Sequence, residues 1–140
     1  MSEVIIKSHL GEIQKAFNER APIIMEAVGL EAEGNAISNV RDMKAVDTGR
    51  LKNSITHGVS GKPFSKPTYS DDQSNTYAGP SGPAPGSTSN ETIAVYIGSN
   101  VEYSPYVELG TYKMASRPFL RNAINDHLDD YKRILQDGLK

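Results

Sequence analysis

Residues 22–40 read PIIMEAVGLEAEGNAISNV, and this stretch decides the fold. Apolar residues recur in it at three- and four-residue spacing, the pattern of one buried helical face, at Ile24, Val28, Ala32, Ala36 and Val40. The same spacing continues upstream, after the candidate N-cap Ser8, at Leu10, Ile13 and Phe17. Because proline suits the first turn of a helix better than its middle, Pro22 predicts two helices, near residues 9–20 and 22–44.

Two glycines, Gly29 and Gly34, lie inside the second of these helices. Each weakens the helix by up to roughly 1 kcal/mol relative to alanine. Close packing of the helix against a neighbour is one way to recover that loss.

Two later segments alternate apolar and polar residues, as β-strands do. They are residues 55–59, ITHGV, and residues 92–97, TIAVYI, and we predict that they pair antiparallel. Residues 4–6, VII, are a candidate for a third, brief strand. With the helices, these strands predict one α+β domain over residues 1–140, in which long helices pack on one face of a small antiparallel sheet.

Local signals also predict a short helix after residue 46. Asp47 is a good N-cap for a helix that ends near residue 53, because its carboxylate can accept the free N–H groups of Gly49 and Arg50.

Two more helices are predicted near the C-terminus. Tyr103 and Val107 share one side of a short helix that Gly110 closes. Pro118 lies in the first turn of the last helix, which ends near residue 136 and has an apolar stripe at Leu120, Ile124, Leu128, Tyr131 and Leu135.

Residues 61–91 differ in kind from the rest of the chain. Of these 31 positions, 15 are Gly, Pro or Ser, and none is Val, Ile, Leu or Met. Such a segment buries too little apolar surface to offset its own ordering entropy, so we predict a long loop or hairpin arm. Asp71 and Asp72 favour an Asx turn, or a simple contribution to solubility, over a calcium site. The candidate interface residues of the arm are Phe64, Tyr69 and Tyr77.

Composition excludes several classes of protein. The net charge is −2, from 15 basic and 17 acidic side chains, so the chain lacks the basic excess of a dedicated nucleic-acid binder. There is no cysteine, which excludes disulfide scaffolds, zinc fingers, iron–sulfur sites and thiol nucleophiles. No run approaches the roughly 20 apolar residues of a membrane span, and we expect no signal peptide.

A search for catalytic, metal and cofactor sites finds little. Residues 58–62, GVSGK, resemble half of a phosphate-binding loop, but the pattern fails at both ends. Glu102 and Glu108 are better explained by surface and capping roles than by a glycosidase pair. No histidine has a ligand-type partner at helical spacing, whether His9, His57 or His127. We therefore expect no enzyme, no metal and no cofactor.

Tyrosine is enriched in one short region, at Tyr96, Tyr103, Tyr106 and Tyr112. Its ring is apolar and its hydroxyl forms hydrogen bonds, so it suits interfaces. For any one ring, a half-buried position in the core is the simpler interpretation. For the cluster together with the arm, a protein–protein surface is at least as good an interpretation.

Three motifs, in this order and spacing, resemble the tailed-phage tail-component family of the lambdoid gene-product-ten type. They are residues 46–55, VDTGRLKNSI, residues 101–111, VEYSPYVELGT, and residues 114–120, MASRPFL. The resemblance covers most of residues 8–138 apart from the arm. Ala45, Leu109 and the pair Ala115-Ser116 depart from the family pattern, and these changes leave the expected fold intact.

The resemblance implies a virion structural protein without catalytic residues, in which the motif residues make the fold. Asp47 then caps the short helix and Gly49 permits a close approach. Arg50 pairs with a carboxylate such as Glu108, while proline and phenylalanine of the third motif start and seat the final helix. The motif residues that we single out are Val46, Asp47, Thr48, Gly49, Arg50, Leu51, Tyr103, Tyr106, Glu108, Gly110, Thr111, Arg117, Pro118 and Phe119.

The implied mechanism is assembly at the neck of a phage or prophage particle, as a tail-completion or head–tail joining protein. We expect a cyclic homo-oligomer, a hexamer by resemblance, that closes through contacts between two different faces. The expected partners are other neck and tail proteins, with only passing contact to DNA and none to a membrane. The expected location is the head–tail junction of the virion, and the host cytoplasm during assembly. A mobile arm would order on a neighbouring subunit by strand addition or by draping across a groove.

Three alternatives stay open. The first is a head-closure or tail-terminator adaptor, which would also form a ring but would contact a different partner. The second is a small hydrolase, which would need a cleft with converged carboxylates. The third is a DNA-packaging accessory protein, which a basic patch would favour if it joined Lys52, Lys62, Lys66, Arg117 and Arg121.

Overall fold

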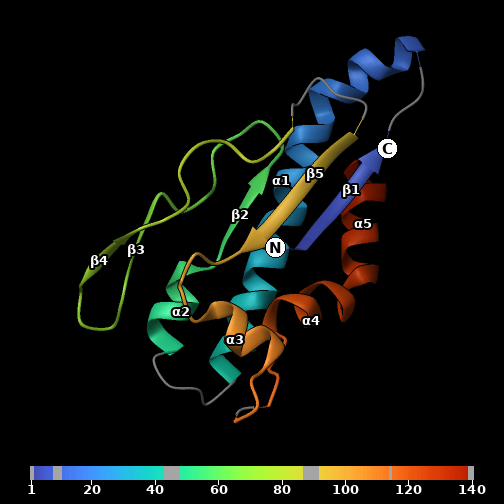
Figure 1. Ribbon diagram of the computed structural model, residues 1–140. Coiled ribbons are helices and arrows are strands. Elements are labelled where there is room, and N and C mark those ends of the chain that lie inside the picture. Colours follow the sequence, from blue (N-terminus) through green and yellow to red (C-terminus); the bar gives the residue numbers. More distant parts are fainter. Residues whose placement is uncertain (1, 8–10, 43–47, 87–91, 114, 139–140) are drawn as a thin grey trace.

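The longest element of the computed structural model is α1 (Gly11–Asp42), a helix of 32 residues that lies along one face of a three-stranded sheet (Figure 1). The sheet contains β1 (Ser2–Lys7), β5 (Thr92–Gly98) and β2 (Thr56–Val59), in the order β1-β5-β2. The structure describes residues 2–7, 11–42, 48–86, 92–113 and 115–138, and it describes side chains within 19–42, 49–86, 93–113 and 115–138.

Both strand pairs in this sheet are antiparallel. Val4 is paired with Val95 across β1 and β5, and Gly58 is paired with Tyr96 across β2 and β5. These pairings confirm the brief N-terminal strand and the antiparallel match of the two later strands. The α+β fold class is therefore confirmed.

The remaining elements surround this core unit. A second, two-stranded antiparallel sheet lies within the segment predicted as an arm. The elements are α2 (Thr48–Ser54), β3 (Thr68–Ser70), β4 (Thr76–Ala78), α3 (Ser104–Leu109), α4 (Phe119–Asn125) and α5 (Leu128–Gly138).

The predicted apolar stripe of α1 forms the centre of the core. Its five members, Ile24, Val28, Ala32, Ala36 and Val40, are all buried. The stripe packs against β2, β5, α2, α4 and α5, so that one helix organises most of the molecule. The upstream members of the stripe, Leu10, Ile13 and Phe17, lie outside the side chains that the structure describes.

The predicted helix break at Pro22 is wrong, because α1 continues through it. Proline inside a helix removes one backbone hydrogen bond and strains the preceding turn. Ala21 and Met25 on either side are completely buried and pack with Val59, Ile93 and Val95 of the sheet. This packing on both sides of the proline explains why tertiary contacts outweigh the local signal.

The predicted single final helix is also wrong, because the chain turns at Asp126 and His127 and forms α4 and α5. The turn lets the Tyr131 hydroxyl donate to the carbonyl of Ala123, one element earlier, while it accepts a hydrogen bond of 3.0 Å from Asn35 Nδ2 of α1. The register of the stripe changes at the turn, and Leu128 is exposed as a result.

Part of the predicted arm covers the second face of the main sheet. A Cβ added to Gly58 would lie 2.7 Å from the ring of Phe64 and 3.1 Å from Cβ of Ala84. The backbone N–H of Ser65 donates to the carbonyl of His57 over 2.8 Å, along the outer edge of β2. Residues 61–86 therefore belong to the folded unit as described.

The two helical glycines should respond in opposite ways to alanine. A Cβ on Gly29 would lie 2.5 Å from the His57 ring, whereas a Cβ on Gly34 would meet nothing within 4 Å among the residues that the structure describes. We expect Gly29→Ala to lower the free energy of unfolding by about 1–3 kcal/mol, and Gly34→Ala to raise it by up to about 1 kcal/mol. Urea denaturation followed by circular dichroism measures both, and equal effects of the two substitutions would contradict the assigned environments.

Candidate functional site

Arg50 of α2 joins the first motif to the second. Its two terminal nitrogens donate to the two carboxylate oxygens of Glu102 over 3.0 and 2.9 Å. The guanidinium also lies over two aromatic rings, 4.2 Å from the centroid of Tyr77 and 5.8 Å from that of Tyr103. Arg50 therefore joins α2, the β3–β4 hairpin and the turn before α3. The expected pairing of Arg50 with a carboxylate is confirmed, but the partner is Glu102 and not Glu108.

The pKa values of Arg50 and Glu102 are shifted by the hydrogen bonds between them. The hydrogen bonds to Glu102 raise the pKa of Arg50, and those from Arg50 lower the pKa of the Glu102 carboxyl. Bidentate pairing also fixes the direction of both side chains, which a lysine could not do. The Arg50–Glu102 pair therefore fixes the position of α2 relative to the turn before α3.

The hairpin is held on α2 by close contacts. The Asp72 carboxylate lies directly against Gly49, where any Cβ would collide with it. Asn53 Nδ2 donates to the carbonyl of Ser70 over 2.7 Å. These contacts hold β3 beside α2, as Figure 1 shows.

The turn of the hairpin is built on Asp71. One carboxylate oxygen accepts the N–H groups of Gln73 and Asn75, and the other accepts the Asn75 amide and the Tyr77 hydroxyl. These hydrogen bonds, those of Asn75 first, lower the pKa of Asp71. The bond to Gln73, two residues on, confirms the predicted Asx turn.

The aromatic rings of the predicted arm serve their own subunit. Tyr69 is buried in the main core, and its ring stacks on that of Tyr77 with centroids 5.5 Å apart. Phe64 packs over Gly58 on the sheet. This arrangement differs from the expectation that the arm orders only on a neighbour, because the stack with Tyr77 and the core beneath Tyr69 supply the apolar surface that composition alone does not reveal.

Glu108 has the capping role expected for it, and it is not the partner of Arg50. Its Oε1 atom accepts the backbone N–H groups of Leu120 and Arg121, each over 3.0 Å, at the start of α4. A carboxylate there satisfies donors that the helix itself leaves unpaired. The backbone N–H of Arg117 also donates to the carbonyl of Val107 over 2.8 Å. The second and third motifs are thus joined in the structure.

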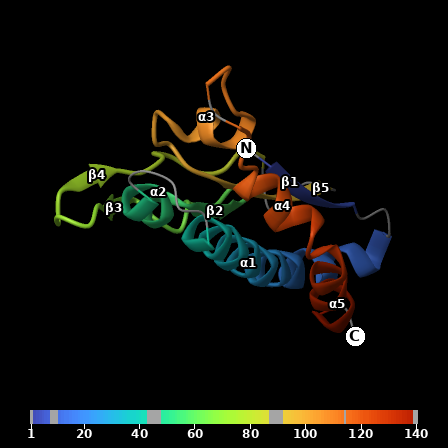
Figure 2. The ribbon, with the colours of Figure 1, turned by 90° about the horizontal axis from the view of Figure 1, so that it is seen from below.

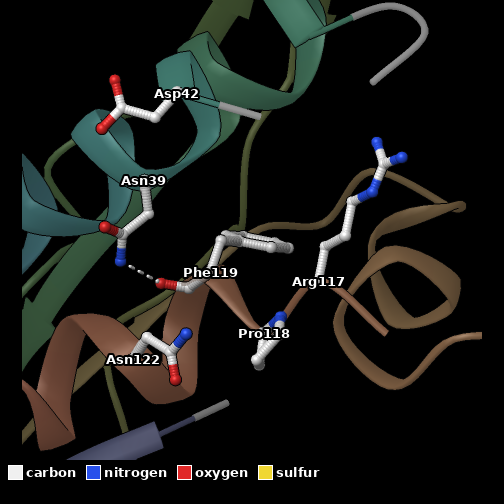
Figure 3. Close-up of a pocket in the computed structure, with 6 residues that line it drawn as sticks. All are labelled: Asn39, Asp42, Arg117, Pro118, Phe119 and Asn122. Atoms are coloured by element: carbon white, nitrogen blue, oxygen red, sulfur yellow. Dashed lines mark hydrogen bonds between the residues drawn. The ribbon is translucent and has the colours of Figure 1, made fainter. Parts of the chain in front are cut away.

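A pocket lies between the end of α1 and the start of α4 (Figure 3). Its volume is about 290 Å³, and Asn39 Nδ2 donates across it to the carbonyl of Phe119 over 3.1 Å. Asp42 and Arg117 lie on different sides of it, as the figure shows. The lining residues are Asn39, Asp42, Arg117, Pro118, Phe119 and Asn122.

Sequence reasoning missed a buried cluster around His57. Its Nε2 and Nδ1 atoms lie 2.5 Å from a Glu26 oxygen and 3.1 Å from a Glu33 oxygen. The Ser65 hydroxyl donates to the same Glu33 oxygen over 2.5 Å. Burial opposes the charge on His57, but the bonds to Glu33 and Glu26 outweigh it and raise the pKa of His57 above 6.5. The sequence signal that could have revealed this cluster is the pair Glu26 and Glu33, seven residues apart on a face of α1 that otherwise packs inward.

This cluster has the wrong geometry for nucleophilic catalysis. In a Ser-His-Asp triad, the imidazole faces the serine hydroxyl and takes its proton. Here both imidazole nitrogens face carboxylates, and the Ser65 hydroxyl is bonded to Glu33 instead. The cluster joins α1, β2 and the segment after β2. Within the described ranges, no group of three or more His, Cys, Asp or Glu side chains is arranged to hold a metal ion.

The other predicted site residues are distributed as follows. Leu51 is buried in the core, and Tyr106 and Thr111 are exposed. Gly110 ends α3 with φ of 80°, and its N–H donates to the carbonyl of Tyr106. Val46, Asp47 and the side chain of Thr48 lie outside the described residues, so the predicted cap is not described. None of the helices, as far as the chain is described, combines the length and apolar character needed to cross a membrane.

The His57 cluster predicts a stability that depends on pH. Because the folded-state pKa of His57 is raised above 6.5, its contribution is complete below that value and is lost as the pH rises through the folded-state pKa. The lowered pKa of Glu33 adds a contribution that is complete above 4.5. We expect His57→Gln to lower the free energy of unfolding by about 1–3 kcal/mol near pH 6, and by less near pH 9.

Urea unfolding at the two pH values measures this difference. The matched control is His127→Gln, since His127 is partly exposed and lies 3.4 Å from one carboxylate, that of Asp130. A penalty for His57→Gln that is independent of pH would show that the imidazole is uncharged in the folded protein.

Replacing Arg50 with lysine should loosen the hairpin without unfolding the core. Lysine keeps the charge but loses the bidentate bond and the planar stacking on Tyr77. We expect faster hydrogen exchange of the amides in β3 and β4, measured by mass spectrometry. Arg133→Lys is the control, because the ion pair of Arg133 with Asp130 is on the surface of α5. Unchanged exchange in the Arg50 variant would mean that Asn53 and Asp72 alone hold the hairpin.

Comparison with known proteins places these motifs in a family. The matching family model is described as "Bacteriophage HK97-gp10, putative tail-component" and matches residues 6–110. The match includes the first motif and nearly all of the second, while the third motif lies beyond it. No match was found among curated proteins or among solved structures. Because 105 of the 140 residues are matched, the chain belongs to the HK97-gp10-like family of bacteriophage tail components.

Proposed function

We propose that this tail component is a tail-completion or head–tail joining protein that forms a ring at the neck, through which DNA passes. Membership of the tail-component family carries the proposal, because it makes the chain a virion protein whose partners include other tail proteins. The protein acts in this proposal by presenting surfaces to its neighbours, and it makes or breaks no covalent bond.

The local geometry supports a role in assembly. Arg50 and Glu108 use their charges to hold neighbouring segments of the same subunit together, through Glu102 and the start of α4. The result is a rigid surface around α2, α3 and α4. A preorganised surface loses less entropy when subunits associate.

In this proposal, DNA passes through the ring without binding tightly to it. The net charge of the chain is −2, and a protein without a basic excess gains little affinity from counterion release. The basic residues considered for a patch are spread over α2, the segment after β2 and the start of α4. DNA binding by the purified protein that persists at physiological salt would contradict this part of the proposal.

Removing the protein from phage particles tests the proposed function. In a phage whose gene for this chain carries a nonsense mutation, we expect DNA-filled heads and separate tails of normal length in electron micrographs. Infectivity should return when the wild-type chain is supplied in trans. Joined, infectious particles in its absence would refute the proposal, and tails of abnormal length would replace it with the tail-terminator alternative.

A further inference from the structure

Exposed large apolar side chains form two groups in the part of the chain that the structure describes, apart from Leu128. The first group, which we call the α1 flank, is Ile23 and Leu30, with 72% and 62% of their surface exposed. They lie seven residues apart, about two turns, and so share one side of α1. The second group, which we call the α3 patch, is Tyr106, Leu109 and Tyr112, exposed by 59%, 71% and 93%.

The two groups are surrounded by opposite charges. Between residues 19 and 33, α1 carries four glutamates and one arginine. When a protonated His57 is counted with them, the excess is still two negative charges. Around the α3 patch lie Lys113, Arg117 and Arg121 against Glu108, an excess of two positive charges, while the exposed Glu102 is neutralised by its pair with Arg50. Lys113 Nζ lies 5.4 Å from the centroid of the Tyr112 ring, at the edge of the patch.

The α1 flank and the α3 patch also lie on opposite sides of the molecule. Figure 2 shows α1 on one side of the main sheet and α3 on the other. When the α1 flank of one copy contacts the α3 patch of another, the resulting pair still has one free α1 flank and one free α3 patch. Further copies can therefore add until a ring closes. A contact of either surface with its own copy would instead bring like charges together.

The α1 flank is shaped for close approach. Leu30 is flanked by Ala27 and Gly34, one turn before and one turn after it. Ala27 is exposed, and nothing within the described chain lies within 4 Å of a Cβ placed on Gly34. The helical penalty of this glycine is thus not recovered by packing inside the subunit, and small residues let an aromatic side chain from outside approach the helix backbone.

We infer that the α1 flank of one copy docks on the α3 patch of the next copy, and that this contact is the repeating interface of the ring. Complementary charge, location on opposite faces and the open surface beside Leu30 support this pairing. The inference rests on the proposed ring and assigns its two surfaces. In this contact, Tyr106, Leu109 and Tyr112 cover the apolar flank, while Lys113 and its neighbours face the glutamates of α1.

Site-specific cross-linking between copies tests this contact. Because the chain has no cysteine, Leu30→Cys and Leu109→Cys each introduce a single thiol. Treated with a short bismaleimide, a mixture of the two full-length variants should give a cross-linked dimer, and each variant alone should give none. A chain with both substitutions should give a ladder that ends at the size of the ring. Leu128→Cys, at an exposed leucine outside both groups, is the control and should stay monomeric with either partner.

The outcomes separate this inference from the proposed function. Cross-linking of Leu30→Cys with itself would show that two α1 flanks pair, and would overturn the inference. Leu30→Glu and Leu109→Glu should each abolish rings, whereas Leu128→Glu should not. If rings persist in both charge variants, the assigned surfaces are wrong and the ring proposal stands. If the wild-type chain forms no ring, alone or in particles, the proposed function fails and this inference fails with it.

Discussion

A buried imidazole between two carboxylates joins the main layers of this protein. His57 lies at the middle of β2, its ring packs against the backbone of α1 at Gly29, and both of its nitrogens face glutamates of that helix. Removing one partner from such a buried polar group leaves hydrogen-bonding atoms unsatisfied in the interior, which is destabilising. The position of the sheet on α1, and of the segment at Ser65 on the sheet, therefore depends on this cluster.

Much of the fold could be predicted from local pattern. The spacing of apolar residues along α1 and the alternation in β2 and β5 identify the layers, because burial of one face leaves a periodic trace in the sequence. The errors occurred at Pro22 and near Asp126. At Pro22, packing on both sides keeps the helix continuous. Near Asp126, a turn gives the Tyr131 hydroxyl two partners that lie far apart in the sequence.

The candidate site was less predictable, because its interactions join distant segments. Arg50 was identified from its motif, but its partner depended on which carboxylate the fold places beside α2, and Glu102 was chosen over Glu108 by geometry alone. His57 is separated from Glu26 and Glu33 by 31 and 24 residues, so no spacing rule connects them. A hairpin arm was predicted, but its strands β3 and β4 and their packing on the core were not, because their apolar support comes from other elements.

The segment that runs beside β2 has a consequence for the behaviour of many copies in one cell. An open strand edge is a template on which further chains can add, and this leads to fibrous aggregates. The backbone of Ser65 bonds to the outer edge of β2, so that another molecule cannot extend the sheet there without first displacing it. At this edge of the sheet, the Ser65 segment therefore keeps further copies from adding as strands.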